Sequence, residues 1–112
     1  YFERAIHHEI FHIINDSHKK LFNKKEWKTF NKKNFRYSEC STCNNNWNLE
    51  LYNKTDGFLT EYSKSTASED MAEIFSHLMF YKNKIYINDP IIKKKIKFIK
   101  SNILKIDNTF NF

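Results

Sequence analysis

Hydrophobic positions recur at helical spacing in three separate parts of the chain. In residues 3–15, and again after Ala67, apolar side chains recur every three or four positions with no helix-breaking residue between them. The third part follows Asp89 and Pro90, a pair typical of a helix cap and first turn. The pattern therefore predicts three helices. The last one has a buried stripe of Ile92, Ile96, Ile99 and Ile103, with its other positions mostly filled by Lys93, Lys94, Lys95, Lys97 and Lys100.

The stretch between the first two helices is more polar. Residues 16–57 are rich in asparagine, with scattered aromatic anchors, and they predict one short helix near 24–32 followed by irregular structure. Asp56-Gly57 indicates a turn, and residues 58–62 then read as a short extended piece. Thr66 and Glu69 have the spacing of a capping box at the start of the second helix.

Composition supports a mainly α chain. The 112 residues include one glycine and one proline, which suits one domain of helices joined by polar loops. No apolar run approaches the roughly 20 residues of a membrane span. The formal net charge of +6 leaves open a basic interaction module that binds nucleic acid. Because the lysines are spread along the chain without a recognisable binding motif, we expect no nucleic-acid partner.

Candidate chemistry begins with His8-Glu9-Ile10-Phe11-His12. On a helix, His8 and His12 project from one face, where two imidazoles can bind one metal ion. Glu9 follows the first of them, and its carboxylate can take a proton from a water molecule that zinc has acidified. The sequence therefore predicts a metal site with Glu9 as general base.

A catalytic zinc site needs a third protein ligand. His18, His77 and an acidic residue are the candidates, and His18 lacks the glycine-containing spacing of the longer three-histidine motif. The second helix has Glu69 and Glu73 on one face, so that one carboxylate can bind the ion while the other braces a ligand histidine. Adjacent helical residues diverge by about 100°.

Glu69 and Asp70 therefore cannot both point at one ion. Glu69 shares its face with Glu73 and is the preferred ligand, which leaves Asp70 to brace a loop or His12. Tyr62 stands seven residues before Glu69 and could donate to an oxyanion, although spacing alone favours a packed aromatic. Cys40 and Cys43 form half of a metal knuckle without a second half, which favours a surface loop with free or bridged thiols.

Residues 57–65, Gly-Phe-Leu-Thr-Glu-Tyr-Ser-Lys-Ser, and residues 68–75, Ser-Glu-Asp-Met-Ala-Glu-Ile-Phe, carry a family resemblance. Together with the histidine motif they resemble a bacterial family of zinc-binding metallopeptidases of the gluzincin type. They are also similar to the catalytic domain of anthrax lethal factor. The similarity covers residues 3–15 and 57–80 well, the last helix loosely and the middle weakly.

The resemblance implies a site and an activity. It implies one zinc ion on His8, His12 and Glu69, with Glu9 as base, Tyr62 as oxyanion donor and peptide-bond hydrolysis as the reaction. It implies Glu73 as the partner of a ligand histidine.

The front of the chain departs from the family pattern, because zincins place a substrate-binding sheet before the active-site helix. We therefore expect residues 1–112 to be a single helical, zinc-binding piece of a zincin-like domain and a fragment of a longer chain, with the N-terminal sheet missing or outside these residues. A peptide or protein is the expected substrate, and a zinc-bound but inactive domain is an alternative. The resemblance is compatible with secretion or a cell-surface location, and the sequence does not indicate an oligomeric state.

Overall fold

The computed structural model describes residues 2–40, 42, 48–51, 55–81 and 88–112. Its elements are α1 (Phe2–Ser17), α2 (Lys24–Lys28), a 3-10 turn η1 (Tyr62–Lys64), α3 (Ala67–Tyr81) and α4 (Pro90–Ile106). Within these ranges there are helices and no strands, so the mainly α prediction is confirmed. None of the described helices is long and apolar enough to cross a membrane.

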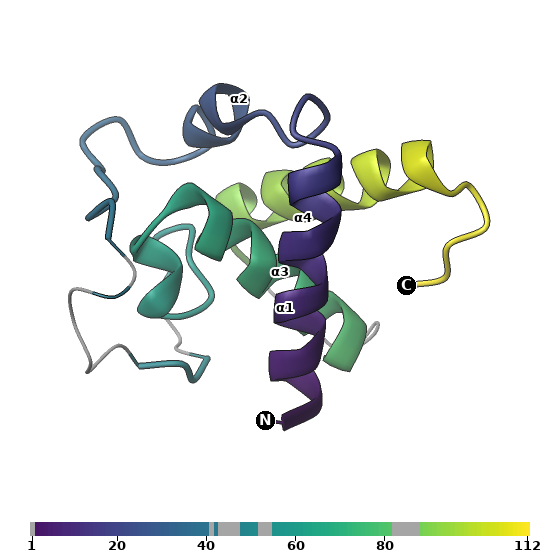
Figure 1. Ribbon diagram of the computed structural model, residues 1–112. Coiled ribbons are helices and arrows are strands. Elements are labelled where there is room, and N and C mark those ends of the chain that lie inside the picture. The colour runs from purple at the N-terminus through teal and green to yellow at the C-terminus, as the bar shows by residue number, and fades with distance from the viewer. Residues whose placement is uncertain (1, 41, 43–47, 52–54, 82–87) are drawn as a thin grey trace.

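Helix α3 is the centre of the fold. It contacts α1, α2, η1 and α4, and α1 crosses it on one side while α4 runs behind (Figure 1). The rings of Phe11 on α1 and Phe75 on α3 pack with their centroids 5.4 Å apart, and Phe22 closes on Phe11 at 5.1 Å. Each of these rings is almost fully buried, which contributes about 1.5–3 kcal/mol per side chain. The pairing holds the two helices that carry the candidate site.

Helix α1 buries a different face from its isoleucine stripe. The buried residues of α1 are Arg4, His8, Phe11 and Asn15. Ile6, Ile10 and Ile13 are exposed, with 45%, 41% and 68% of their surface open. Helical spacing was therefore a sound guide to the helix itself, while packing on α3 selected the face that carries His8.

Helix α4 is anchored at its first turn to the turn around Gly57. The carboxylate of Asp89 accepts from the N–H groups of Ile91 and Ile92 at 2.9 and 3.3 Å, and from Gly57 N–H at 2.7 Å. Gly57 has a φ of +95°, and a Cβ there would lie 2.7 Å from Ile91 Cγ2. Only glycine suits this turn, in line with the Asp56-Gly57 prediction.

Two local predictions differ from the structure. Helix α2 ends at Lys28 and does not reach residue 32, because the Thr29 hydroxyl and N–H both bond back to the Glu26 carbonyl. Residues 59–61 form bends instead of an extended strand. The Ser63 and Lys64 N–H groups donate to the carbonyls of Thr60 and Glu61, at 3.2 and 3.0 Å, and wind this segment into η1.

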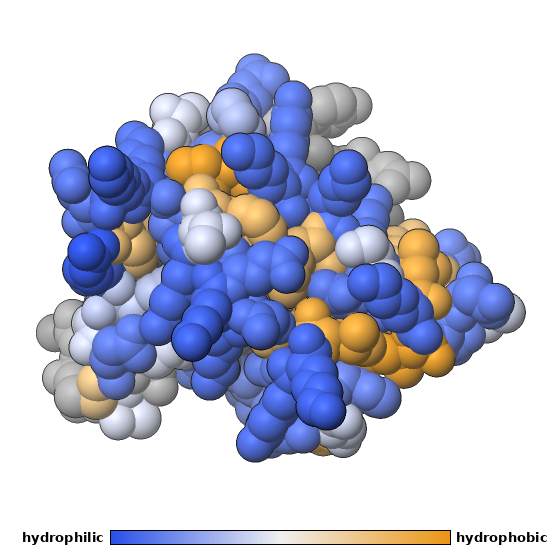
Figure 2. Space-filling view, turned by 90° about the horizontal axis from the view of Figure 1, so that it is seen from above, coloured by the Kyte–Doolittle hydropathy of each residue, from blue (hydrophilic) through white to orange (hydrophobic). Residues whose placement is uncertain are grey.

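Most of the surface seen from above is hydrophilic, with smaller hydrophobic patches between the polar side chains (Figure 2). Lysines contribute much of the net charge of +6. One lysine of α4 departs from this pattern: Lys95 is fully buried, so the prediction that it belongs to the lysines filling the outside of the helix is wrong. The physical reason is that its ammonium donates to Asp70 Oδ2 and to the Gly57 carbonyl, both at 2.7 Å.

Candidate metal centre

Helix α1 brings two histidine nitrogens together. His8 and His12 are one turn apart, their ring centroids lie 4.9 Å apart, and their Nε2 atoms are separated by 3.2 Å. Glu9 is exposed on the same helix. The donor atoms of His8, Glu9 and His12 all lie within 4.8 Å of one another, so this group could hold a metal ion.

Helix α3 delivers a carboxylate to the same point. Its first turn is capped by Thr66, whose hydroxyl accepts from Glu69 N–H at 3.1 Å, and this cap agrees with half of the predicted capping box. The Glu69 side chain points to the histidines. Its Oε1 lies 2.5 Å from His12 Nε2 and 3.1 Å from His8 Nε2. Ligands at about 2.1 Å from a tetrahedral zinc are about 3.4 Å apart. The separations of 3.1 and 3.2 Å that involve His8 are close to this spacing, whereas the 2.5 Å between His12 and Glu69 is tighter.

Glu73 holds the other side of the His8 ring. His8 Nδ1–H donates to Glu73 Oε2 at 2.9 Å, and Glu73 is 4% exposed. In the neutral ring, a proton held on Nδ1 leaves Nε2 with its lone pair directed toward His12 and Glu69. The pairing of a ligand histidine with a buried carboxylate is typical of metal sites.

The electrostatics of the cluster favour charge in His8, Glu69 and Glu73. Burial by itself lowers the pKa of His8, but the hydrogen bonds and charges of Glu69 and Glu73 outweigh it and raise that pKa to about 9. Burial raises the pKa of Glu69, and the hydrogen bonds from His12, His8 and Tyr62 more than reverse this, so the pKa of Glu69 lies well below its usual range. Burial raises the pKa of Glu73 as well, but the hydrogen bond from His8, together with the other histidine interactions and the Thr60 hydrogen bond, more than reverses this, so that pKa is lowered. The site therefore carries two carboxylates beside the His8 imidazolium, and a cation that replaced the His8 proton would take over as their counter-charge.

Tyr62 opens η1 and reaches the cluster from the side. Its hydroxyl donates to Glu69 Oε2, and its ring centroid lies 5.9 Å from that of His8. The phenol thus lies beside the carboxylate oxygen that is turned away from the His12 nitrogen. The Tyr62 hydroxyl therefore lies in direct contact with one of the candidate ligands.

Asp70 faces away from the histidines into a buried polar cluster. Its Oδ2 accepts from Tyr37 O–H and Lys95 Nζ, both at 2.7 Å, and from Trp27 Nε1 at 3.1 Å. Of the two roles left open by the sequence, bracing a loop fits these contacts, since Tyr37 belongs to the segment after α2. Burial raises the pKa of Asp70 despite the Lys95 charge, and burial lowers the pKa of Lys95 despite the carboxylate.

The two other candidate ligands do not join the cluster. His18 follows the end of α1, where its carbonyl accepts from Leu21 and Phe22 N–H. His77 is fully buried one turn beyond Glu73, and its Nδ1–H donates to the Glu73 carbonyl at 2.6 Å. Burial lowers the pKa of His77 to about 4, so the ring is neutral.

Sequence reasoning missed two residues in and around the site. The first is Thr60, fully buried, whose hydroxyl donates to Glu73 Oε1 at 2.8 Å. The second is Lys95, which also donates to the Gly57 carbonyl at 2.7 Å. Its spacing could have revealed it, because residues 92, 95, 99 and 102 all share the buried face of α4. For Thr60 the pattern of hydrophobic positions carried no such signal.

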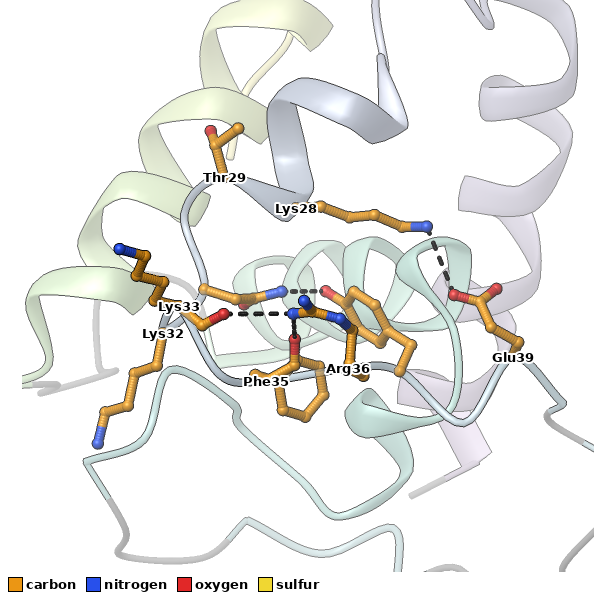
Figure 3. Close-up of a pocket in the computed structure, with 9 residues that line it drawn as sticks. Lys28, Thr29, Lys32, Lys33, Phe35, Arg36 and Glu39 are labelled. Atoms are coloured by element: carbon orange, nitrogen blue, oxygen red, sulfur yellow. Dashed lines mark hydrogen bonds and ion pairs between the residues drawn. The ribbon is translucent and has the colours of Figure 1, made fainter.

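A cavity of about 550 Å³ lies away from this cluster, lined by residues between Lys28 and Glu39 (Figure 3). Four cations and one carboxylate line it, and none of the candidate metal ligands does. Lys28 is paired with Glu39 at 3.4 Å, and the Arg36 guanidinium donates to the backbone carbonyls of Lys33 and Phe35. Because two of the four cations are engaged locally, this cavity adds little to the nucleic-acid alternative.

Only Cys40 of the cysteine pair lies among the described residues. Cys40 is disulfide-bonded, so its thiol is bridged and not free. Cys43 and the asparagine run after it lie outside the described residues.

Comparison with known proteins gives a family match. A family described as "Putative zinc-binding metallo-peptidase" matches residues 1–105, which include every candidate ligand. No curated protein and no solved structure matches the chain. The similarity to the anthrax lethal factor catalytic domain therefore stays a prediction. Since the family match spans nearly the whole chain, the chain belongs to this zinc-binding metallopeptidase family.

Proposed function

We propose that the protein is a zinc-dependent peptidase of the gluzincin type, in which His8, His12 and Glu69 hold one zinc ion. The observation that carries the proposal is the position of Glu69 Oε1, within 3.1 Å of both histidine Nε2 atoms. A carboxylate from a second helix completes the two-histidine, one-glutamate donor set of a catalytic zinc site. Membership of a family described as zinc-binding supports the same choice of metal.

The proposed reaction is hydrolysis of a peptide bond. Zinc, when bound, supplies Lewis acidity and lowers the pKa of water. Glu9, exposed beside the two histidines, takes a proton from the attacking water and delivers it to the leaving amine. Tyr62 releases its hydrogen bond to Glu69 and donates to the oxyanion of the tetrahedral intermediate. Glu73 keeps the His8 ring oriented throughout. Addition of water across the peptide bond gives one carboxylic acid and one amine.

Metal analysis tests the ligand assignment. Protein purified without chelators should hold about one zinc per chain, since structural and catalytic sites bind zinc tightly at neutral pH. The double variant His8→Ala/His12→Ala should lose that zinc. A matched control is His18→Ala, because His18 lies outside the cluster. Retention of one tightly bound equivalent by the double variant would refute the ligand set.

A conservative change tests the base. Glu9→Gln in the full-length protein should keep its zinc and lose peptide turnover by about 10²–10⁴-fold, because an amide cannot accept the proton. Glu3→Gln is the control, since Glu3 is an exposed glutamate on the same helix. Turnover by Glu9→Gln at the rate of the control would show that Glu9 is not the base. Zinc binding without turnover in the unmodified protein would favour the inactive-domain alternative.

A further inference from the structure

We propose that Thr60 is a positioning residue of the metal centre: its hydroxyl fixes the Glu73 carboxylate, and Glu73 fixes the His8 ring that presents Nε2 to the ion. This inference rests on the proposed function and deepens it, because it names a residue outside the ligand set that controls the geometry of one ligand. Nothing in the histidine motif or in the family description assigns a role to Thr60.

A continuous chain of contacts leads from Thr60 to the candidate metal position. Thr60 Oγ1 donates to Glu73 Oε1 at 2.8 Å, and the other oxygen of the same carboxylate accepts from His8 Nδ1–H at 2.9 Å. The exposed fractions are 0% for Thr60, 4% for Glu73 and 8% for His8. Because water has little access to these groups, neither carboxylate oxygen can readily exchange its protein partner for solvent. Losing one bond therefore frees the carboxylate to rotate.

Ser63 determines the direction of the Thr60 hydroxyl. A hydroxyl has one proton to donate and two lone pairs to accept with. Ser63 N–H lies 3.2 Å from Thr60 Oγ1, and the Ser63 hydroxyl lies 2.9 Å from it. When both donate to Thr60, its lone pairs are used and its single proton is left for Glu73. The first turn of η1 thus orients the bond that holds the carboxylate.

A purely structural role is the alternative, in which Thr60 is one more satisfied buried hydroxyl. Ser76 provides the comparison. It is also fully buried and on the same helix as Glu73, and its hydroxyl donates to the Glu73 backbone carbonyl at 3.0 Å. Removing the Ser76 hydroxyl therefore takes away a buried hydrogen bond of similar kind without touching the Glu73 carboxylate or His8.

The test is zinc affinity, measured by competition with a chromophoric chelator, for Thr60→Val, Thr60→Ser and Ser76→Ala. Partners of ligand histidines typically affect metal affinity by 10–100-fold, so we expect Thr60→Val to bind zinc roughly tenfold more weakly than the unmodified protein. Thr60→Ser retains the hydroxyl and should stay within about threefold, as should Ser76→Ala. Absorption spectra with cobalt in place of zinc should change for Thr60→Val alone among the three variants.

Coupling to Glu73 provides a readout that a structural role would not produce. If Thr60 acts through Glu73, the losses from Thr60→Val and Glu73→Gln should not add in the double variant. Additive losses, or a Thr60→Val affinity equal to that of Ser76→Ala, would overturn the inference while leaving the zinc site intact. Failure of the unmodified protein to bind zinc would instead overturn the proposed function, and this inference with it. Thr60→Ala replaces Thr60→Val in the same comparison if the valine variant does not fold.

Discussion

Replacement of Lys95 by methionine should destabilise the protein strongly although the lysine is far along the chain from the metal ligands. The Lys95 ammonium is fully buried and lies 2.7 Å both from Asp70 Oδ2 and from the Gly57 carbonyl. It also sits 4.0 Å from the centre of the Phe58 ring. Lys95→Met keeps most of the side-chain volume, so the main effect is the loss of the cation from a buried carboxylate.

The magnitude follows from these contacts. Removing one member of a buried ion pair costs about 3–5 kcal/mol, because the remaining charge has neither water nor a counterion. Protonation of Asp70 limits the cost, since burial already raises the pKa of this carboxyl. We therefore expect the free energy of unfolding to fall by about 3–4 kcal/mol. Domains of this size are stable by only about 5–15 kcal/mol, so the variant should unfold well below the unmodified protein.

Urea denaturation followed by circular dichroism measures this difference. Lys97→Met is the matched control, because Lys97 is exposed on the same helix and the substitution makes the same change of charge and size. It should alter stability by no more than about 0.5 kcal/mol. Both variants need the same free zinc concentration, since a bound ligand raises apparent stability. A loss for Lys95→Met within about 1 kcal/mol of the control would refute the buried ion pair as a main support of the fold.

Three further predictions concern the metal centre. Apparent zinc affinity should rise about tenfold per pH unit between pH 6.5 and 9 and then level off, because zinc must displace the proton that His8 holds below its pKa of about 9; a flat titration over this range would contradict the raised pKa. Tyr62→Phe should keep zinc and lower kcat about 10²–10³-fold with little change in KM, as measured by steady-state peptide hydrolysis, and an unchanged kcat would remove Tyr62 from the mechanism. Glu69→Gln should weaken zinc binding at least tenfold in a chelator competition, and full retention would exclude Glu69 as a ligand.

Helix positions and the two-histidine motif could be predicted from the sequence because they depend on local spacing. His8 and His12 are four residues apart, and any helix through them puts both rings on one face. Asp89 with Pro90, and Thr66 before the second helix, mark helix starts through contacts that span only two or three residues. Such features need no knowledge of the rest of the chain.

The choice between neighbouring acids needed more than spacing. Glu69 and Asp70 are adjacent, and the sequence placed them on different sides of one helix without showing what each side contacts. In the structure, Glu69 meets the histidines of α1, whereas Asp70 meets Trp27, Tyr37 and Lys95. The two directions are separated by the geometry of a single helix, and the partners come from segments that are far apart in the chain.

Only the tertiary structure decided which faces are buried and which hydroxyl supports the site. Ile6, Ile10 and Ile13 of α1 are exposed. His8 and His12 contact glutamates of α3 instead, although hydrophobicity alone favours the opposite arrangement. Lys95 is buried because Asp70 and the Gly57 carbonyl accept its hydrogen bonds, and these partners are too far away in the sequence to be predicted from a local pattern. The sequence by itself determined the helices, the pair His8 and His12, and the shared face of Glu69 and Glu73, since these follow from the period of the helix. The packing of α1 on α3 determined how they converge, because burial and hydrogen bonding between distant segments depend on the whole fold.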